Sequence, residues 1–389
     1  MIRLRTIGCI NFGTLFTLTV LVVGMALSPD LFAAAVSEEA VRAYTFADVK
    51  ITDAQRRAAE DFYRGKTIEW VSYTNPGAGT EVMLRVMMKY FPKYIPGNPR
   101  MGSIQFMRGG GGLLSSNYLY NRAPRDGTMI GQISAGTHRS YISGRKGTDY
   151  DLNKFTWVAN YLPRNYHYLV FTRKGIGMDS IEQLIKAPKV NMGVTEVGHA
   201  FYNSMRLGSY ILGIKFNIIP GYSDKEIDLA FERAEVDGKV DAALSFMTEK
   251  RHWLDQGKAV IHWTTEYTRF PQLPQVPTIF ELAKKQSKPP LTPKDQALLQ
   301  VNWDIGAYGR YLAMPPGVPP ERALAVQEAV GKMMEDKEFY KEFSKLTGFD
   351  PEFTPGEVLI QTFQRLSDQP KEILDLWLEL SGPNPLPKR

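Results

Sequence analysis

The 389-residue sequence has one cysteine, five histidines and no large excess of charge of either sign. Cys9 alone cannot form an internal disulfide or a cysteine-rich metal site. The histidines lack H-x-x-x-H and H-E-x-x-H spacing, which excludes a helical zinc motif. No G-x-S-x-G element marks a hydrolase nucleophile. The net charge of +6 is small for this length and gives no reason to expect a nucleic-acid partner.

Long apolar runs are scarce too, and the one that exists lies at residues 7–27, after Arg3 and Arg5. Three alanines at residues 33–35 follow it, a pattern typical of signal-peptide cleavage. We therefore predict a signal peptide over residues 1–35 and export of the remaining chain. An uncleaved anchor stays the alternative, because the run is near the length that spans a bilayer.

The rest of the sequence alternates short apolar runs, glycine-rich turns and amphipathic segments. This alternation predicts an α/β protein with parallel sheets covered by helices. Strands are expected at 68–71, 104–106, 129–133, 168–171, 190–194, 216–219, 242–244 and 260–262. Helices are expected at 82–91, 113–120, 180–186, 199–212, 225–234, 319–337, 338–347 and 356–381. Residues 284–297, rich in Lys, Pro and Gln, are expected to form a surface loop.

Three glycine-rich turns, at residues 75–81, 108–112 and 195–199, each join an expected strand to an expected helix. Small residues let a ligand approach the backbone, and the first amides of a helix lack internal partners. Together with the helix dipole, these amides favour an anion. The alternative for each turn is that its glycines only make it tight. None of the turns matches a nucleotide-binding fingerprint, so no phosphate-containing cofactor is expected.

His199 is the histidine of most interest, because it opens an expected helix beside Gly198. It acts either at a ligand site or as a packed capping residue. Asp237 lies in an acidic turn before an expected strand. An exported hydrolase using His199 with Asp237 or Glu196 is therefore an alternative to a binding protein, although no Ser or Cys nucleophile accompanies these residues.

Six fragments in order resemble the periplasmic solute-binding receptors of tripartite tricarboxylate transporters. The resemblance extends from about Tyr63 to about Arg365. The family's P-G-G-G-T-D loop is similar to residues 76–81, and its P-G-A-G-G turn is similar to residues 108–112. The other four fragments are at residues 123–129, 221–237, 274–278 and 313–319.

The resemblance implies the type II periplasmic-binding-protein fold, with two lobes and a ligand cleft between them. It divides the chain into an N-terminal helical extension at 36–66, lobe 1 at 67–165 plus 305–389, and lobe 2 at 166–304. It also implies ligand-binding residues, which are Thr74, Asn75, Gly77, Ala78, Gly79, Thr80, Arg108, Gly109, Gly110, Gly111, Gly112, Thr195, Gly198, His199 and Asp237.

The implied function is the capture of a small organic anion in the periplasm, a carboxylate, with aromatic carboxylates included. The implied partners are the membrane subunits of a transporter, and the receptor is expected to be a monomer without cofactor, metal or catalysis. A ligand-sensing partner of a signalling protein is an alternative. Four departures from the family bear on the ligand: Glu81 replaces Asp, Arg108 replaces Pro, Phe106 replaces Asn, and His199 replaces a small residue.

Overall fold

The computed structural model describes residues 43–163, 167–307 and 309–389. The predicted signal peptide and residues 36–42 of the predicted extension lie outside these ranges. Among the described residues, none of the helices combines the length and the apolar character needed to cross a membrane.

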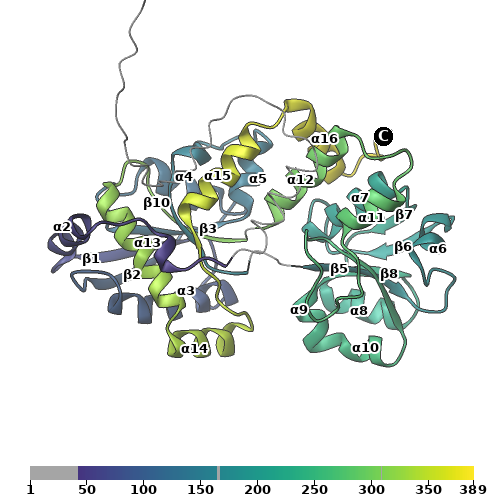
Figure 1. The fold of residues 1–389 in the computed structure, drawn as a ribbon, viewed down its shortest axis with the longest axis horizontal. Coiled ribbons are helices and arrows are strands. Elements are labelled where there is room, and N and C mark those ends of the chain that lie inside the picture. The colour runs from purple at the N-terminus through teal and green to yellow at the C-terminus, as the bar shows by residue number, and fades with distance from the viewer. Residues whose placement is uncertain (1–42, 164–166, 308) are drawn as a thin grey trace, which may run out of the picture.

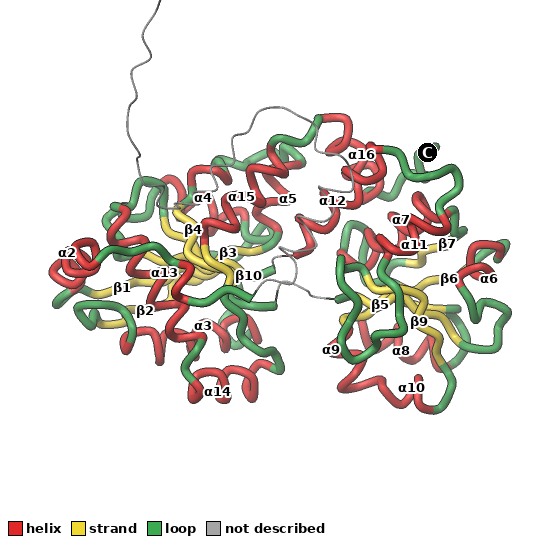
Figure 2. The backbone as a smooth tube through the Cα atoms, in the orientation of Figure 1, coloured by secondary structure: helices red, strands yellow, loops and turns green. Residues whose placement is uncertain are grey.

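The strands form two separate sheets (Figures 1 and 2). The first has the order β11-β4-β10-β3-β1-β2 and contains β1 (Thr67–Ser72), β2 (Arg100–Phe106), β3 (Met129–Ser134), β4 (Thr156–Asn160), β10 (Arg310–Met314) and β11 (Thr354–Pro355). The second has the order β7-β6-β8-β5-β9 and contains β5 (Tyr168–Arg173), β6 (Val190–Gly193), β7 (Phe216–Ile219), β8 (Gly238–Ala242) and β9 (Ala259–Thr264). We call each sheet with its covering helices lobe 1 and lobe 2.

Helices cover both sheets and bridge them. Those before β5 are η1 (Phe46–Asp48), α2 (Asp53–Tyr63), α3 (Gly79–Tyr90), η2 (Phe91–Lys93), α4 (Leu113–Asn121), α5 (Gly136–Ile142) and η3 (Leu152–Lys154). Those between β5 and β10 are α6 (Ile181–Lys186), α7 (Ala200–Leu212), α8 (Asp224–Glu232), α9 (Ala243–Ser245), η4 (Phe246–Lys250), α10 (Arg251–Asp255), α11 (Ile279–Gln286) and α12 (Pro293–Ala307). The last are α13 (Pro320–Met334), α14 (Lys337–Thr347), α15 (Gly356–Ser367) and α16 (Lys371–Ser381).

The two-lobe α/β architecture expected from the resemblance is confirmed. The chain builds β1 to β4, crosses to lobe 2, and returns through α12 to β10 (Figure 1). The sheets are mixed and not purely parallel, because β10 and β5 each pair antiparallel with both of their neighbours. We did not predict β10 from the sequence. Its buried positions form a continuous run, which lacks the alternation that signals a strand exposed on one face.

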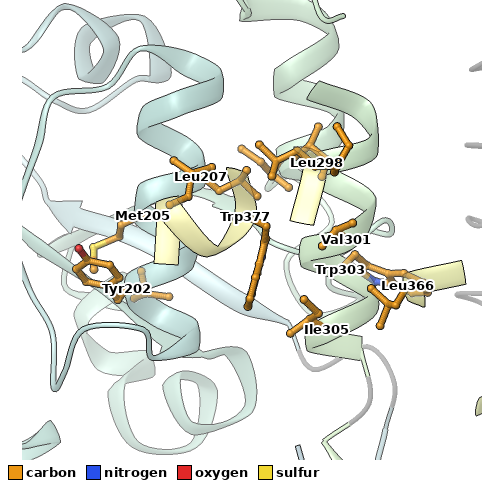
Figure 3. Packing of buried hydrophobic residues seen from close by; sticks show 14 of the residues in the cluster. Tyr202, Met205, Leu207, Leu298, Val301, Trp303, Ile305, Leu366 and Trp377 are labelled. Atoms are coloured by element: carbon orange, nitrogen blue, oxygen red, sulfur yellow. The ribbon is translucent and has the colours of Figure 1, made fainter. Parts of the chain in front are cut away.

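The surface loop expected at residues 284–297 is confirmed only for residues 287–292, because α11 ends at Gln286 and α12 begins at Pro293. The second half of α12 is buried on several sides, and its Leu298, Val301 and Trp303 pack between the lobes (Figure 3). Burying these side chains removes apolar surface from water, which offsets the weak helix signal of the Lys- and Pro-rich start.

The C-terminal helix α16 bridges the lobes with α12. Its Trp377 lies beside α12, and the indole N–H donates to Asn302 Oδ1 at 3.2 Å (Figure 3). On the lobe 2 side, Arg206 of α7 donates to the carbonyl oxygens of Leu380 and Asn384. The α16 segment, which follows α15 of lobe 1, therefore also contacts lobe 2. The lobe boundaries drawn from the sequence stay a prediction.

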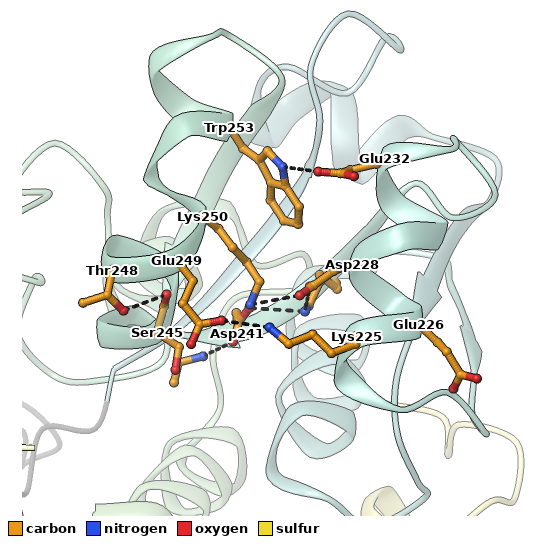
Figure 4. A network of polar contacts seen from close by, with 12 residues as sticks. Lys225, Glu226, Asp228, Glu232, Asp241, Ser245, Thr248, Glu249, Lys250 and Trp253 are labelled. Atoms are coloured by element: carbon orange, nitrogen blue, oxygen red, sulfur yellow. Dashed lines mark hydrogen bonds and ion pairs between the residues drawn. The ribbon is translucent and has the colours of Figure 1, made fainter. Parts of the chain in front are cut away.

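Lobe 2 contains a buried network of two lysines and two aspartates (Figure 4). Lys239 is 1% exposed, and its Nζ lies 2.5 Å from Asp228 and 3.2 Å from Asp241. Lys250, at the end of the π-helical turn η4, lies 2.6 Å from Asp241. Burial alone would lower the pKa of Lys250, but the hydrogen bond and charge of Asp241 outweigh it and raise that pKa. Lys250 therefore depends on these carboxylates to stay charged in the interior.

Asp241→Asn is expected to destabilise the protein by about 3 kcal/mol, because it leaves two buried ammonium groups with one carboxylate. Urea unfolding of the full chain measures the change. Glu249→Gln is the matched control: Glu249 pairs with Lys225 at 3.2 Å on the exposed surface, where loss of the pair costs at most about 1 kcal/mol. Equal stability of the two variants would contradict the assigned role of the network.

Candidate functional site

A cavity of about 260 Å³ lies where the two lobes meet. Lobe 1 and the connection to lobe 2 contribute Met83, Ala135, Arg139, Leu162, Pro163, Arg310 and Phe349. Lobe 2 contributes Tyr168, His199, Ala200, Asn203, Ser204, Thr265 and Glu266. The end of α12 and α16 contribute Asn302, Trp303, Ile305, Gly306, Gly309 and Trp377.

Arg139 on α5 brings a positive charge to this cavity from lobe 1. Its Nη1 donates to the carbonyl oxygen of Gly198 in lobe 2 at 3.3 Å. Its Nε is buried and has no hydrogen-bond partner among the described residues. A buried N–H without a partner costs free energy, so a ligand oxygen at this point would remove a penalty.

The amino end of α7 forms the facing wall. His199 is its N-cap residue, and its Nδ1 accepts from the Phe201 backbone N–H at 3.3 Å. Asn203 donates through Nδ2 to Gly198 O at 3.3 Å, while its Oδ1 is buried without a partner among the described residues. Burial and then the charge of Arg139 lower the pKa of His199, so the ring is neutral at neutral pH. The wall therefore offers a helix N-terminus and neutral polar groups.

Glu266 lies after β9 and is 4% exposed. Its Oε2 accepts from the Trp303 indole N–H at 2.7 Å, and its Oε1 accepts from the Thr265 hydroxyl at 3.4 Å. Burial raises the pKa of this carboxyl to about 7, against the opposing effect of the two hydrogen bonds. The cavity thus combines two arginines from lobe 1 with one acid from lobe 2.

The predicted turn at Thr74, Asn75, Gly77, Ala78, Gly79 and Thr80 does not line this cavity. The Glu81 carboxylate, from the first turn of α3, occupies the anion position at the N-terminus of that helix. The Gly77 N–H donates to Glu81 Oε2 at 2.5 Å, and this hydrogen bond, ahead of the Arg85 interactions, lowers the pKa of the buried Glu81. The substitution of Glu for Asp therefore supplies an internal anion at a helix end that we expected to bind a ligand.

Arg108 and the loop of Gly109, Gly110, Gly111 and Gly112 are also outside the cavity. Arg108 is exposed, donates to Asn75 Oδ1 at 3.3 Å and lines a separate surface groove. The loop packs on the turn before α5: a Cβ on Gly136 would lie 2.3 Å from Gly111 O, and one on Gly112 would lie 2.6 Å from Ser134 Cβ. Close packing, with φ of +100° at Gly112, explains these glycines.

In lobe 2, Gly198 and His199 approach Arg139, but Thr195 and Asp237 do not line the cavity. The Thr195 carbonyl accepts from Gly221 N–H in a loop contact. The Asp237 carboxylate accepts from Asn191 N–H at 2.8 Å and from Arg173 at 3.2 Å. Asn191 is at the start of β6, whereas Thr195 follows its end, so the structure does not bring Asp237 together with His199.

The sequence reasoning missed Arg139, Asn203, Glu266 and Arg310. The sequence did contain a signal for Arg139, because residues 134–137 are another run of small residues between an expected strand and a helix. Asn203 lies one turn after the N-cap residue His199. Glu266 had no such signal, because a single acid after a strand is ordinary. Among the described residues there is no cluster of His, Cys, Asp and Glu that could hold a metal ion.

Comparison with curated sequences gives one relative for part of the chain. A UPF0065 protein from the tcbD-tcbE intergenic region of Pseudomonas sp. (strain P51) is 28% identical over 242 residues, which is 60% of this chain and 68% of the relative. No family model matches the chain.

Solved structures with the same fold are numerous. A TctC solute-binding protein from Polaromonas superposes with a TM-score of 0.61 and 16% identity, covering 80% of this chain and 99% of that one. The periplasmic binding protein BugD gives a TM-score of 0.50 and 17% identity, covering 84% and 100%. A structure of R. palustris Rpa4515 with adipate gives 0.50 and 16%, covering 81% and 96%.

The ordered motifs, the partial match to a UPF0065 protein and the two-lobe architecture agree with one another. The chain therefore shares the two-lobe fold of the TctC solute-binding protein and of the periplasmic binding protein BugD.

Proposed function

We propose that the protein is a periplasmic receptor that captures a small organic anion between its lobes and delivers it to a transporter, without catalysis. The observation that carries this proposal is the meeting of Arg139 from lobe 1 with Gly198 and the α7 N-terminus from lobe 2, at 3.3 Å. A carboxylate at this point would accept from a guanidinium and from helix amides at once.

The geometry suits binding by lobe closure. The two walls come from different lobes, so a ligand that contacts both favours the conformation in which they are close. Arg139 Nε and Asn203 Oδ1, both buried without a partner among the described residues, supply further polar contacts for a bound molecule. The curated relative and the structures of the same fold support a receptor role, and the structure with adipate makes dicarboxylates the first compounds to test.

The hydrolase alternative has weak support. Its two residues, His199 and Asp237, have separate partners: His199 accepts from Phe201 N–H, and Asp237 is paired with Arg173. A general base needs to be within hydrogen-bond reach of its orienting acid and its nucleophile. Export through the predicted leader and delivery to membrane subunits remain parts of the proposal that follow from the sequence resemblance.

Isothermal titration and thermal shift with mono-, di- and tricarboxylates, aromatic acids included, test the proposal. At least one compound is expected to raise the melting temperature in a concentration-dependent way. Arg139→Gln is expected to weaken its binding by about 10- to 100-fold, because charge-assisted hydrogen bonds contribute about 1.5–3 kcal/mol.

Two control variants make the test specific. Arg108→Gln removes the arginine in the surface groove, and Arg57→Gln removes an exposed arginine of α2. Both are expected to bind like the unmodified protein. If no organic anion binds, the function is wrong; if Arg108→Gln weakens binding and Arg139→Gln does not, the site is the one expected from the sequence and not the cavity.

A further inference from the structure

Glu266 is an acid in the wall of a cavity that we propose to bind anions. A carboxylate offers about four acceptor positions, of which the Trp303 and Thr265 donors occupy two, at 2.7 and 3.4 Å. A neutral side chain such as glutamine could also accept the hydrogen bond from Trp303, which links the end of β9 to α12. The buried charge therefore calls for an explanation at the cavity.

Within residues 43–163, 167–307 and 309–389, no cation pairs with the Glu266 carboxyl. Burial raises its pKa to about 7, and among the described residues only the two uncharged donors oppose that shift. Charges as buried as this one are normally paired, because desolvation without a partner is costly. Elsewhere in lobe 2 the buried Asp241 follows this rule and has Lys250 at 2.6 Å. Glu266 has no such cationic partner in the part of the chain that the structure describes.

The other charged groups of the cavity wall are on its lobe 1 side. Arg139 donates to Gly198 O at 3.3 Å, and Arg310 donates to Gly309 O at 2.8 Å. Lobe 2 contributes His199, which is neutral, and Tyr168, while α12 contributes Asn302 and Trp303 but no charged side chain. Positive charge from one lobe thus faces a single negative charge from the other, with a small polar cavity between them.

We propose that Glu266 is a specificity-determining residue that receives the ammonium group of a zwitterionic ligand, whose carboxylate binds on the Arg139 side. The ligand class is a small organic acid that carries a protonated amino group. The inference rests on the proposed function, because it assumes that an organic anion enters this cavity. The ligand supplies the cation that the described residues do not give to Glu266, and ligand binding thereby pairs both charges.

Matched pairs of compounds, with and without an amino group, test the inference in the full chain by isothermal titration. Suitable pairs are L-glutamate with glutarate and L-phenylalanine with 3-phenylpropionate. At pH 8 the amino member of at least one pair is expected to bind at least 10-fold more tightly. Glu266→Gln keeps an acceptor for Trp303 and is expected to abolish this preference, because it weakens binding of the amino member far more than binding of the amino-free member.

Glu196→Gln is the matched control. Glu196 is exposed on the turn before α7 and does not line the cavity, so its removal changes the overall charge equally without changing the preference. Preference for the amino-free members in the unmodified protein would overturn the inference and leave the receptor function intact. An equal loss of both members in Glu266→Gln would also overturn it, since that result indicates a structural role. Binding of no compound of either kind would instead overturn the proposed function.

The pH dependence of binding gives a second readout. As the pH falls below about 7, Glu266 takes up a proton, so the affinity for the amino compound is expected to fall by up to about tenfold per pH unit. The amino-free compound has no ammonium for Glu266 to pair with and is expected to lose no affinity as the pH falls. Titrations from pH 6 to 8 with unmodified protein and Glu266→Gln measure this. A parallel pH profile in the two proteins would contradict the assignment.

The stability of the free protein supplies a ligand-independent prediction. The pKa of Glu266 is raised from 4.5 to about 7 in the folded state, so between these values the folded chain holds a proton that the unfolded chain has released. Stability is therefore expected to fall as the pH rises through this window. The melting temperature of the unmodified protein should drop relative to that of Glu266→Gln from pH 4.5 to 7. Parallel curves would show that the carboxyl is not desolvated.

Discussion

The arrangement of the whole molecule depends on apolar packing between α7, α12 and α16. One continuous cluster of buried side chains runs from Trp157 and Tyr311 in lobe 1, through Trp303 and Trp377, to Met205 in lobe 2. Because protein interiors are close-packed, these helices hold the two sheets at a defined separation on one side. The cavity lies against this packing, at the end of α12, so its width depends on how the bridging helices are seated.

The same packing explains why a helix with an unpromising sequence forms in the connection. Residues 284–297 contain lysines and prolines that favour a loop when only local preference is considered. Tertiary burial of Leu298 and Val301 overrides that preference. By contrast, β1 and β3 could be predicted from the sequence, because each is an apolar run followed by small residues and a helix. β10 could not be predicted in this way. It pairs with Asn160 of β4 and Ser134 of β3, and both lie more than 150 positions earlier in the chain.

The type of candidate site, an anion site at the ends of helices, could be predicted from the sequence, but most of the residues that line it could not. Glycine-rich turns after strands did indicate where backbone amides gather: His199 lines the cavity, and the Gly198 carbonyl accepts from Arg139. Local sequence cannot show which helix ends are already occupied. The Glu81 carboxylate and the packing of Gly111 on Gly136 are contacts between side chain and backbone, or between two turns, which appear only when the chain is folded. Arg139 and Glu266, the charged residues on which the proposals rest, are single residues without a motif.

The contact between Gly111 and Gly136 has a consequence for how the candidate site can change in evolution. The four-glycine loop fills the space behind the turn that starts α5, and Arg139 lies on the first turn of that helix. Any side chain introduced at Gly136 would have to displace the loop backbone, which tilts α5 and moves the guanidinium with it. Substitutions in the four-glycine loop, which does not line the cavity, would therefore alter which ligands the cavity could accept. Ligand preference could therefore change through residues that support the cavity wall as well as through residues that line it.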